Sequence, residues 1–406
     1  MGGEPSSGSL PTKRVAVLGG GLSGLSAARR LLDHGFRVSL VERRPFLGGR
    51  VYSFRDAETG VEVDNGQHLF LGCCSYYIDF LEAIDSSERV FLQKDLRVEV
   101  VRDGKLGVLS SVPLLGPLHL LLAFARFPHL GLRDKLLVAY GLLQAKRTDR
   151  SRPELDAESG YHWLKRHRQT DRAIDNLWNF IVLPTLNDNV RDVSAAMLLM
   201  VFQESLLKGP RDAAVGYSRV GLTSLNGEPA RRSLESRGCA ITMGKTVRAM
   251  RAHDGRITHV ELAGGQRLEA DAYVSALPFE VLQATLPPEL AAEPFFAEAD
   301  SLSSSPIVGI HLWYDRPVMD QDFVAFLGSP VQWVFNKSAI QGDDSMPGQY
   351  VCISLSGAWP YIKLPKERLV ADFTKELAKL LPRARDARVE RSIVVKEPRA
   401  TFRSAP

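Results

Sequence analysis

Cysteine is scarce in this sequence of 406 residues, which contains only four. Cys73, Cys74, Cys239 and Cys352 form no CxxC pair and no zinc-binding spacing. This arrangement argues against a disulfide framework or a zinc module, and it predicts a reduced, cytoplasmic protein without a metal site. We interpret the adjacent Cys73 and Cys74 as small buried side chains beside a tight turn.

An excess of charge of one sign is also missing. Lys and Arg total 51 and Asp and Glu total 47, which gives a formal net charge of +4. The balance is too even to indicate a nucleic-acid partner, so we expect none. Residues 1–12 lack the apolar core of a signal peptide, and we predict that they form a disordered leader.

Long hydrophobic runs are absent as well. No stretch reaches the roughly 18 uninterrupted apolar residues that a membrane-spanning helix needs. The nearest candidate, residues 112–143, is interrupted by Arg126, Pro128 and the charged residues 133–135. It is either a buried pair of helices or a surface that lies against a bilayer with its basic residues at the headgroups.

What the sequence does contain, near its start, is a β-α-β unit. Short apolar runs at 14–18 and 37–41 predict two strands. Between them, residues 22–34 show helical periodicity and end at Gly35, a residue suited to the left-handed position after a helix. Crossovers of this kind join parallel strands with a right-handed connection.

The rest of the chain alternates between helical and extended patterns. They predict helices over most of 114–207, short strands from 238 with turns at 254–255 and 264–265, strands at 306–314 and 323–335, and a helix at 366–381. The sequence therefore indicates a mixed α/β fold built from two intertwined domains.

A glycine-rich turn connects the first strand to the first helix. Gly19 permits the tight bend, Gly21 lets the backbone approach a pyrophosphate, and Gly24 lets helix and strand pack closely. Leu22 and Ser23 open the helix, where free N–H groups and the helix dipole favour phosphate. This combination predicts a dinucleotide site.

Glu42 ends the second strand, where a carboxylate can accept hydrogen bonds from ribose hydroxyls. The segment that begins there, ERRPFLGGR, resembles the second fingerprint of the flavin amine oxidase superfamily. The resemblance implies FAD as the cofactor, with a Rossmann-like domain, and it implies that Arg44, Gly49 and Arg50 contact the cofactor. It also implies that the backbone at Val247, in a later strand pair, meets the adenine.

A polar stretch, Asn65-Gly66-Gln67-His68, follows this turn. The resemblance implies that the chain passes the flavin ring here, which makes Gly66 and Gln67 candidate cofactor contacts. His68 is a candidate catalytic proton donor. A histidine that only orients the loop is the alternative.

Several further motifs are similar to squalene-associated FAD-dependent desaturase-like proteins, the hydroxysqualene dehydroxylases of squalene and hopanoid synthesis. They are Asp64–His68, Trp163–His167, Leu177–Trp178 leading to Leu183–Asn187, Val193–Ala195 and Pro330–Phe335. The resemblance implies reduction of hydroxysqualene to squalene, with FADH2 as hydride donor and loss of water. The electron source stays open, with NAD(P)H as one candidate.

This chemistry requires a site without water, so we expect an apolar tunnel lined by residues 112–207. Asn187 is a candidate contact for the substrate hydroxyl, and a helix-ending Asn/Asp cluster is the alternative. Because the substrate is a membrane hydrocarbon, we expect residues 112–143 to contact the inner face of the cell membrane peripherally.

The predicted domains are an FAD-binding domain (13–95 and 208–285) and a substrate-binding domain (96–207 and 286–395). Relatives normally continue into a third FAD-binding segment, which we expect to be missing after residue 406, through either a truncated chain or an incomplete gene model; a true truncation would put flavin affinity and activity in doubt. Two other functions stay open: a phytoene-type carotenoid desaturase or other polyprenoid oxidoreductase, and a non-catalytic prenyl carrier of the same fold.

Overall fold

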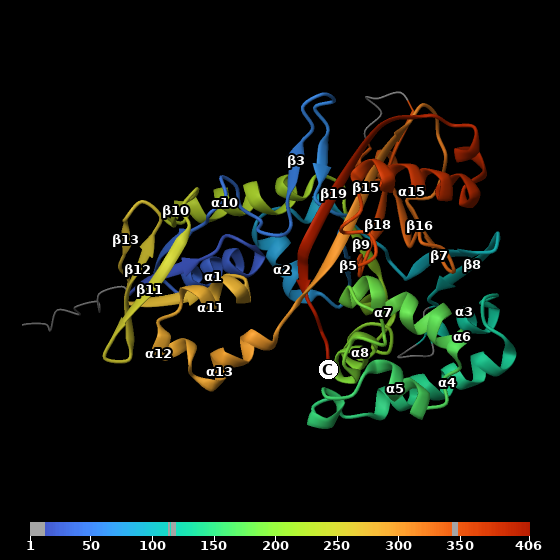
Figure 1. Ribbon diagram of the computed structural model, residues 1–406, viewed down its shortest axis with the longest axis horizontal. Helices are drawn as coiled ribbons and strands as arrows, with labels where there is room; N and C mark the ends of the chain where they lie inside the picture. The colour runs from blue at the N-terminus through green and yellow to red at the C-terminus, as the bar shows by residue number, and fades with distance from the viewer. Residues whose placement is uncertain (1–12, 113, 115–118, 343–347) are drawn as a thin grey trace, which may run out of the picture. The chain divides into compact units, whose positions relative to one another are not determined.

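A computed structural model describes residues 13–112, 114, 119–342 and 348–406 (Figure 1). The leader predicted at 1–12 and five residues of the predicted membrane-contacting segment, 113 and 115–118, lie outside this range. The chain forms two compact units, each assembled from three stretches of sequence. Unit 1 comprises Met1–Asp64, Phe80–Ser86 and Gly221–Leu302, and unit 2 comprises Asn65–Asp79, Ser87–Val220 and Ser303–Pro406.

Unit 1 is built on a four-stranded sheet in the order β10-β2-β1-β14. Its strands are β1 (Arg14–Leu18), β2 (Arg37–Val41), β10 (Ala240–Thr242) and β14 (Ala272–Ser275). All three pairings are parallel. The central strand β1 is buried on both faces from Val15 to Leu18, as is usual within a parallel sheet. The predicted bounds of the first two strands are confirmed.

Helix α1 (Leu22–Asp33) joins β1 to β2 and buries Gly24, Leu25 and Ala28. It ends beside Gly35, whose φ of +79° is in the left-handed region, as predicted. The other elements of this unit are β3 (Ser53–Arg55), β4 (Glu62–Asp64), α10 (Glu228–Glu235), β11 (Val247–His253), β12 (Arg256–Leu262), β13 (Arg267–Leu268), α11 (Phe279–Thr285), α12 (Pro288–Ala291) and α13 (Pro294–Ala297). The predicted turns at 254–255 and 264–265 connect β11, β12 and β13 into an antiparallel sheet.

Unit 2 is built on a seven-stranded sheet in the order β19-β15-β18-β17-β16-β7-β8. Its strands are β7 (Arg97–Arg102), β8 (Lys105–Ser110), β15 (Ser304–Tyr314), β16 (Phe323–Phe326), β17 (Trp333–Asn336), β18 (Gln349–Leu355) and β19 (Val389–Phe402). The prediction of one strand over 323–335 was wrong. Gly328, with φ +73°, and Pro330 turn the chain there, so the segment is a hairpin of β16 and β17.

Helices cover both faces of this sheet. Side chains that alternate along β15, including Val308, Ile310 and Leu312, pack with α15 (Lys366–Leu380) on one face. A larger core on the other face joins Phe335 and Cys352 to a layer of helices (Figure 1). This layer comprises α3 (Leu121–Arg126), α4 (Leu132–Arg147), α5 (Gly160–Arg166), α6 (Asp171–Ala173), α7 (Asn179–Leu186) and α8 (Ala195–Glu204).

Smaller elements complete unit 2. They are β5 (Leu69–Leu71), β6 (Val90–Leu92) and β9 (Val215–Ser218), which form a three-stranded sheet, with α9 (Pro210–Ala213) and α14 (Lys337–Gln341). Helix α2 (Ser75–Ala83) contains one of the sequence boundaries between the two units, at Asp79 and Phe80. Among the described residues, no helix is both long and apolar enough to cross a bilayer.

The cysteine pair before α2 differs from expectation. Gly72 and Cys73 do lie in a turn, where their N–H groups donate to the carbonyls of Ala214 and Asp212. Cys74 is nevertheless exposed and Cys73 only half-buried. The prediction of a buried pair was therefore wrong, because the turn lies at the surface.

Candidate cofactor and substrate site

The first glycine turn of unit 1 has no room for side chains at two positions. Gly19 has φ +106°, and a Cβ there would lie 2.7 Å from the carbonyl oxygen of Ala276. A Cβ on Gly24 would lie 1.9 Å from the carbonyl oxygen of Gly19. Both obstacles are backbone atoms, so neither position tolerates a larger residue without a shift of the turn.

A second glycine turn packs directly on the first. The Gly48 N–H donates to the carbonyl of Gly20 at 2.8 Å. A Cβ on Gly49 would lie 2.8 Å from the Cα of Gly21. The sequence suggested two separate phosphate-binding turns, and the structure joins them into one cradle at the N-terminus of α1. Gly21 is the N-cap residue there and Leu22 and Ser23 are the first helical residues, so their N–H groups meet no capping side chain from Gly21.

Glu42 is buried and connects the parts of this cradle. Its Oε2 accepts from the Gly20 N–H at 2.7 Å, and its Oε1 accepts from the Arg44 N–H at 2.9 Å. The chain after β10 returns to the same place, where the Lys245 N–H donates to the Glu42 carbonyl at 3.0 Å. This contact leads into β11, whose first residue, Val247, is buried.

The two arginines of the second turn lie differently. Arg44 donates from Nη1 to the Gly49 carbonyl at 2.8 Å, and its guanidinium lies 4.6 Å from the ring centre of Tyr52. Arg44 therefore stabilises the turn itself. Arg50 is exposed.

In unit 2, the predicted polar stretch lies against the large sheet. A Cβ on Gly309 of β15 would lie 3.9 Å from the Cα of Gly66, so chain and strand approach closely. The Asn65 Nδ2 donates to the Glu397 Oε1 at 3.2 Å, and the Gln67 Oε1 accepts from the Lys337 Nζ at 3.0 Å. His68 is half-buried beside them.

Sequence reasoning missed the partners of this stretch. Lys337 is almost completely buried, with 1% exposure, which is rare for lysine. On the same sheet, the His311 Nδ1 lies 2.7 Å from the Tyr350 hydroxyl. The Tyr350 ring stacks on Trp313, with ring centres 4.2 Å apart. The signal was present, because a polar residue inside an apolar strand such as PIVGIHLWY needs a buried partner.

Asn187 has a structural role. It ends α7 in the left-handed conformation, with φ 56°. Its Nδ2 donates to the Thr401 Oγ1 at 3.1 Å, and its Oδ1 accepts from the Gly357 N–H at 2.8 Å. These contacts match the helix-ending alternative. The catalytic role of Asn187 stays a prediction.

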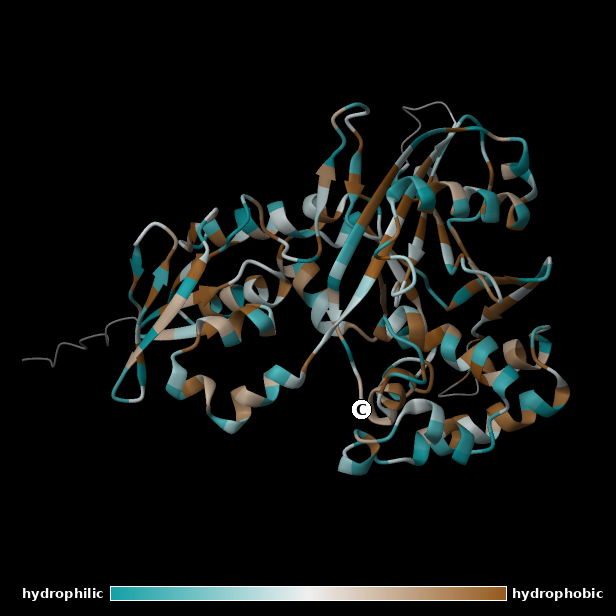
Figure 2. Cartoon of the chain, in the orientation of Figure 1, coloured by the Kyte–Doolittle hydropathy of each residue, from teal (hydrophilic) through white to brown (hydrophobic). Residues whose placement is uncertain are grey.

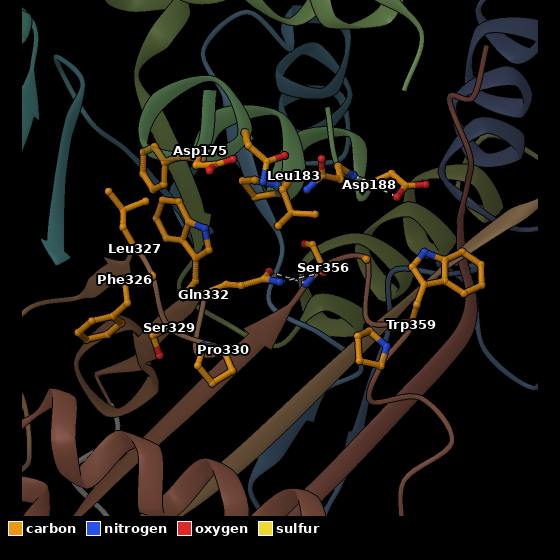
Figure 3. Close-up of a pocket in the computed structure, with 18 of the residues that line it drawn as sticks. Asp175, Leu183, Asp188, Phe326, Leu327, Ser329, Pro330, Gln332, Ser356 and Trp359 are labelled. Atoms are coloured by element: carbon orange, nitrogen blue, oxygen red, sulfur yellow. Dashed lines mark hydrogen bonds between the residues drawn. The ribbon is translucent and has the colours of Figure 1, made fainter. Parts of the chain in front are cut away.

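Unit 2 also contains a cavity of about 430 Å³ next to the turn between β16 and β17 (Figure 3). Gln332 crosses its floor, where its amide group exchanges two hydrogen bonds with the Ser356 backbone, at 2.8 and 3.0 Å. Aromatic and apolar side chains share the lining with carboxylates. The principal lining residues are Asp175, Phe180, Leu183, Asp188, Asp192, Pro330, Gln332, Trp333 and Trp359.

Comparison with known proteins identifies the family of this chain. Residues 22–403 match the family described as "Flavin containing amine oxidoreductase". The chain belongs to this family, and FAD is its cofactor. It is an oxidoreductase with the amine oxidase-type fold.

Named relatives narrow the comparison. The chain is 25% identical to a 15-cis-phytoene desaturase of Synechococcus elongatus, over 97% of this chain and 86% of the relative. It is 26% identical to a zeta-carotene desaturase of Zea mays, over 99% of this chain and 77% of that protein.

Solved structures confirm the fold. Putrescine oxidase bound to putrescine superposes with a TM-score of 0.71 at 17% identity, covering 95% of this chain and 84% of that one. Cyclohexylamine oxidase from Brevibacterium oxydans gives a TM-score of 0.70 at 16% identity, covering 95% and 85%.

The cradle in unit 1 fits this cofactor. No side chain fits at Gly19, Gly24 or Gly49 without a shift of the backbone, and the N–H groups at the start of α1 are the kind of donors that bind a diphosphate. The buried carboxylate of Glu42 lies at the end of β2, the position at which a ribose hydroxyl is bound in folds of this kind.

Proposed function

We propose that this protein is an FAD-dependent oxidoreductase of linear polyprenoids. The cradle of two packed glycine turns carries the proposal, because it provides a diphosphate site in a chain whose named relatives are carotenoid desaturases. FAD supplies the group that accepts or donates a hydride.

The chain's own residues bind and orient the cofactor. We propose that Gly19, Gly21 and Gly24, with the N–H groups of Leu22 and Ser23, hold the diphosphate. Glu42 holds the ribose, and Gly49 and Arg50 complete the second turn. Arg44 acts through its bond to the Gly49 carbonyl. Unit 1 is accordingly the FAD-binding part, with Val247 near the adenine.

Unit 2 is the substrate-binding part in this proposal. Gly66 lies over Gly309 of its sheet, and the next residues are Gln67, which Lys337 fixes, and His68. His68 is the candidate that holds a proton near the reacting carbon. The apolar core around Phe335 and Cys352, on the same face of the sheet as Gly309, keeps water away from it.

The direction of hydride transfer distinguishes two substrates. The relatives support removal of hydride from a phytoene-type carotenoid precursor. The motifs at Leu183–Asn187 and Pro330–Phe335 support the reverse direction, in which the C–O bond of hydroxysqualene breaks, the hydroxyl leaves as water after it gains a proton, and the carbon gains a hydride.

Activity measurements separate these outcomes. The purified protein is incubated with FAD and phytoene plus a quinone acceptor, or with pre-reduced FAD and hydroxysqualene. Desaturated product in the first reaction supports the carotenoid substrate, and squalene in the second supports hydroxysqualene. A protein that shows no flavin absorbance and turns over neither substrate contradicts the proposal and favours a prenyl carrier.

A surface on α4 supports peripheral membrane contact at the inner face of the cell membrane, the location of such substrates. Leu132, Leu136, Tyr140 and Leu143 are all exposed, Leu132 by 77%, and their spacing places them on one face of the helix. Figure 2 shows hydrophobic and hydrophilic residues alternating along α4. The exposed Arg133 gives this face a positive neighbour for anionic headgroups.

A further inference from the structure

The cavity of unit 2 is formed by segments that carry the narrow sequence motifs. Phe180 and Leu183 belong to α7, which ends in the Leu183–Asn187 motif, and Gln332 and Trp333 belong to the Pro330–Phe335 motif (Figure 3). These segments are far apart in the sequence and have no role in binding FAD in the proposal above. Their convergence on one cavity indicates a shared ligand.

A row of paired residues connects this cavity to the polar stretch at Gly66. Gly309 of β15 pairs with Ser354 of β18, and Ser354 pairs with Trp333 of β17. Side chains of directly paired residues lie on the same face of a sheet. Because neighbouring strands lie about 4.8 Å apart, Trp333 stands roughly 10 Å from Gly309 on that face.

Side-chain size increases along this row toward Trp333. Gly309 has no side chain and lies under Gly66, and Ser354 has a small one. Ser354 is half-exposed in the middle of a seven-stranded sheet, whereas its neighbours Ile353 and Leu355 on the opposite face are completely buried. Trp333 ends the row and stacks on Phe180 of α7, with ring centres 5.5 Å apart and planes 14° from parallel.

The charges around the cavity select against an anionic ligand. Its described lining includes Asp175, Asp188 and Asp192 but no lysine or arginine. Arg403 lies 2.6 Å from Asp188 and 3.9 Å from Asp192, so one guanidinium faces two of the three carboxylates. A prenyl diphosphate would bring two further phosphates to a rim that already has a net negative charge.

We propose that the row Gly309–Ser354–Trp333 and the cavity beyond it bind the distal end of a neutral polyprenoid, and that Trp333 sets the chain length accepted. This inference rests on the proposed function and adds the substrate specificity of the site. An uncharged hydrocarbon or alcohol enters the cavity, whereas the corresponding prenyl diphosphate does not.

Two variants test the chain-length role in the full-length holoenzyme. Trp333→Ala removes the large side chain that ends the row, and we expect kcat/KM for a C40 polyene to rise at least tenfold relative to a C30 substrate. Ser354→Leu places a larger side chain within the row, and we expect at least a tenfold loss for both. Phe295→Ala, at an exposed aromatic residue of unit 1, is the control. Flavin content should stay unchanged in all three variants, and circular dichroism should show each of them folded at the assay temperature.

A binding measurement tests the charge selection. Wild-type protein should bind farnesol at least tenfold more tightly than farnesyl diphosphate, and Asp175→Asn with Asp192→Asn should narrow that ratio. Equal binding of the two ligands by the wild type would overturn the selection. An active wild type whose chain-length ratio is unchanged in Trp333→Ala, or whose kcat/KM is unchanged in Ser354→Leu, would overturn the inference alone, whereas a wild type that turns over no polyprenoid contradicts the proposed function.

Discussion

At the scale of single residues, alanine substitutions at Gly21 and Gly24 should have different effects: the first on FAD binding and the second on folding. A Cβ on Gly24 would lie 1.9 Å from a backbone oxygen, whereas the nearest atom to a Cβ on Gly21 is the Gly49 Cα at 3.7 Å, an ordinary contact. We therefore expect Gly24→Ala to unfold unit 1. Gly21→Ala should fold, with a loss of about 1 kcal/mol at the N-cap, and bind FAD at least tenfold more weakly.

Circular dichroism measures whether Gly24→Ala and Gly21→Ala fold, and flavin absorbance measures how much FAD each variant binds. Gly209→Ala is the control, because Gly209 has extended backbone with φ 179° and its added Cβ would meet only a side-chain oxygen at 3.4 Å. Full FAD binding by Gly21→Ala would show that the diphosphate lies elsewhere.

The carboxylate of Glu42 gives a second prediction at this scale. It accepts from two backbone N–H groups, one at each oxygen. The amide of Glu42→Gln accepts at only one of these positions and leaves the other donor unsatisfied, so we expect a loss of roughly 1–3 kcal/mol in the free energy of unfolding. Urea denaturation without FAD measures it. An unchanged midpoint would mean that the loop, and not the carboxylate, holds the turn.

Cys74 should react faster than the other cysteines. A hydrogen bond from the Cys73 thiol stabilises the Cys74 thiolate and lowers the pKa of Cys74 to about 6, whereas the same bond and burial raise the pKa of Cys73. The rate of alkylation should therefore increase as pH rises through about 6 and then level off. Mass spectrometry after iodoacetamide treatment identifies the site. Cys74→Ser should abolish the fast phase, and a midpoint near 9 would contradict the lowered pKa.

At the scale of elements, the exposed face of α4 predicts membrane attachment. Replacing Leu132 and Leu136 with serine removes two exposed apolar side chains, each worth about 2 kcal/mol if it becomes buried in lipid. We expect a loss of at least tenfold in partitioning to anionic phosphatidylglycerol vesicles, measured by flotation. Leu106→Ser is the control, since Leu106 is 53% exposed on β8. Equal partitioning of both variants would contradict an α4 contact.

The elements also show how much local pattern determines. The bounds of β1 and β2 and the end of α1 at Gly35 follow from short apolar runs and one glycine. The bounds of the strands within 323–335 do not follow from local pattern in the same way, because a turn at Gly328 and Pro330 divides one apolar run into two strands. Asn187 was ambiguous for a similar reason: the same Asn/Asp cluster can end a helix or contact a ligand, and its bonds to Gly357 and Thr401 match the helix-ending alternative.

At the scale of the whole molecule, FAD binding should stabilise the native state. Free ligand at 100 times its Kd adds about 2.7 kcal/mol, and each kcal/mol shifts the Tm of a 150–250-residue domain by about 2–4 °C. We expect FAD to raise the Tm of the wild type by several degrees. It should raise the Tm of Gly21→Ala by clearly less, because a tenfold higher Kd leaves only about 1.4 kcal/mol of stabilisation at the same FAD concentration. Thermal scans with and without FAD make the comparison, and an equal shift in both proteins would contradict the assigned cradle.

The sequence by itself determined the β-α-β unit, the two glycine turns, Glu42 and therefore the flavin class, because these features depend on neighbours within a short stretch of chain. Tertiary structure decided what distant segments do together. Only the folded chain places Gly49 on Gly21, Lys337 against Gln67, and Trp333 two strands from Gly309. Strand order and side-chain burial create these contacts, and neither can be deduced from spacing along the chain.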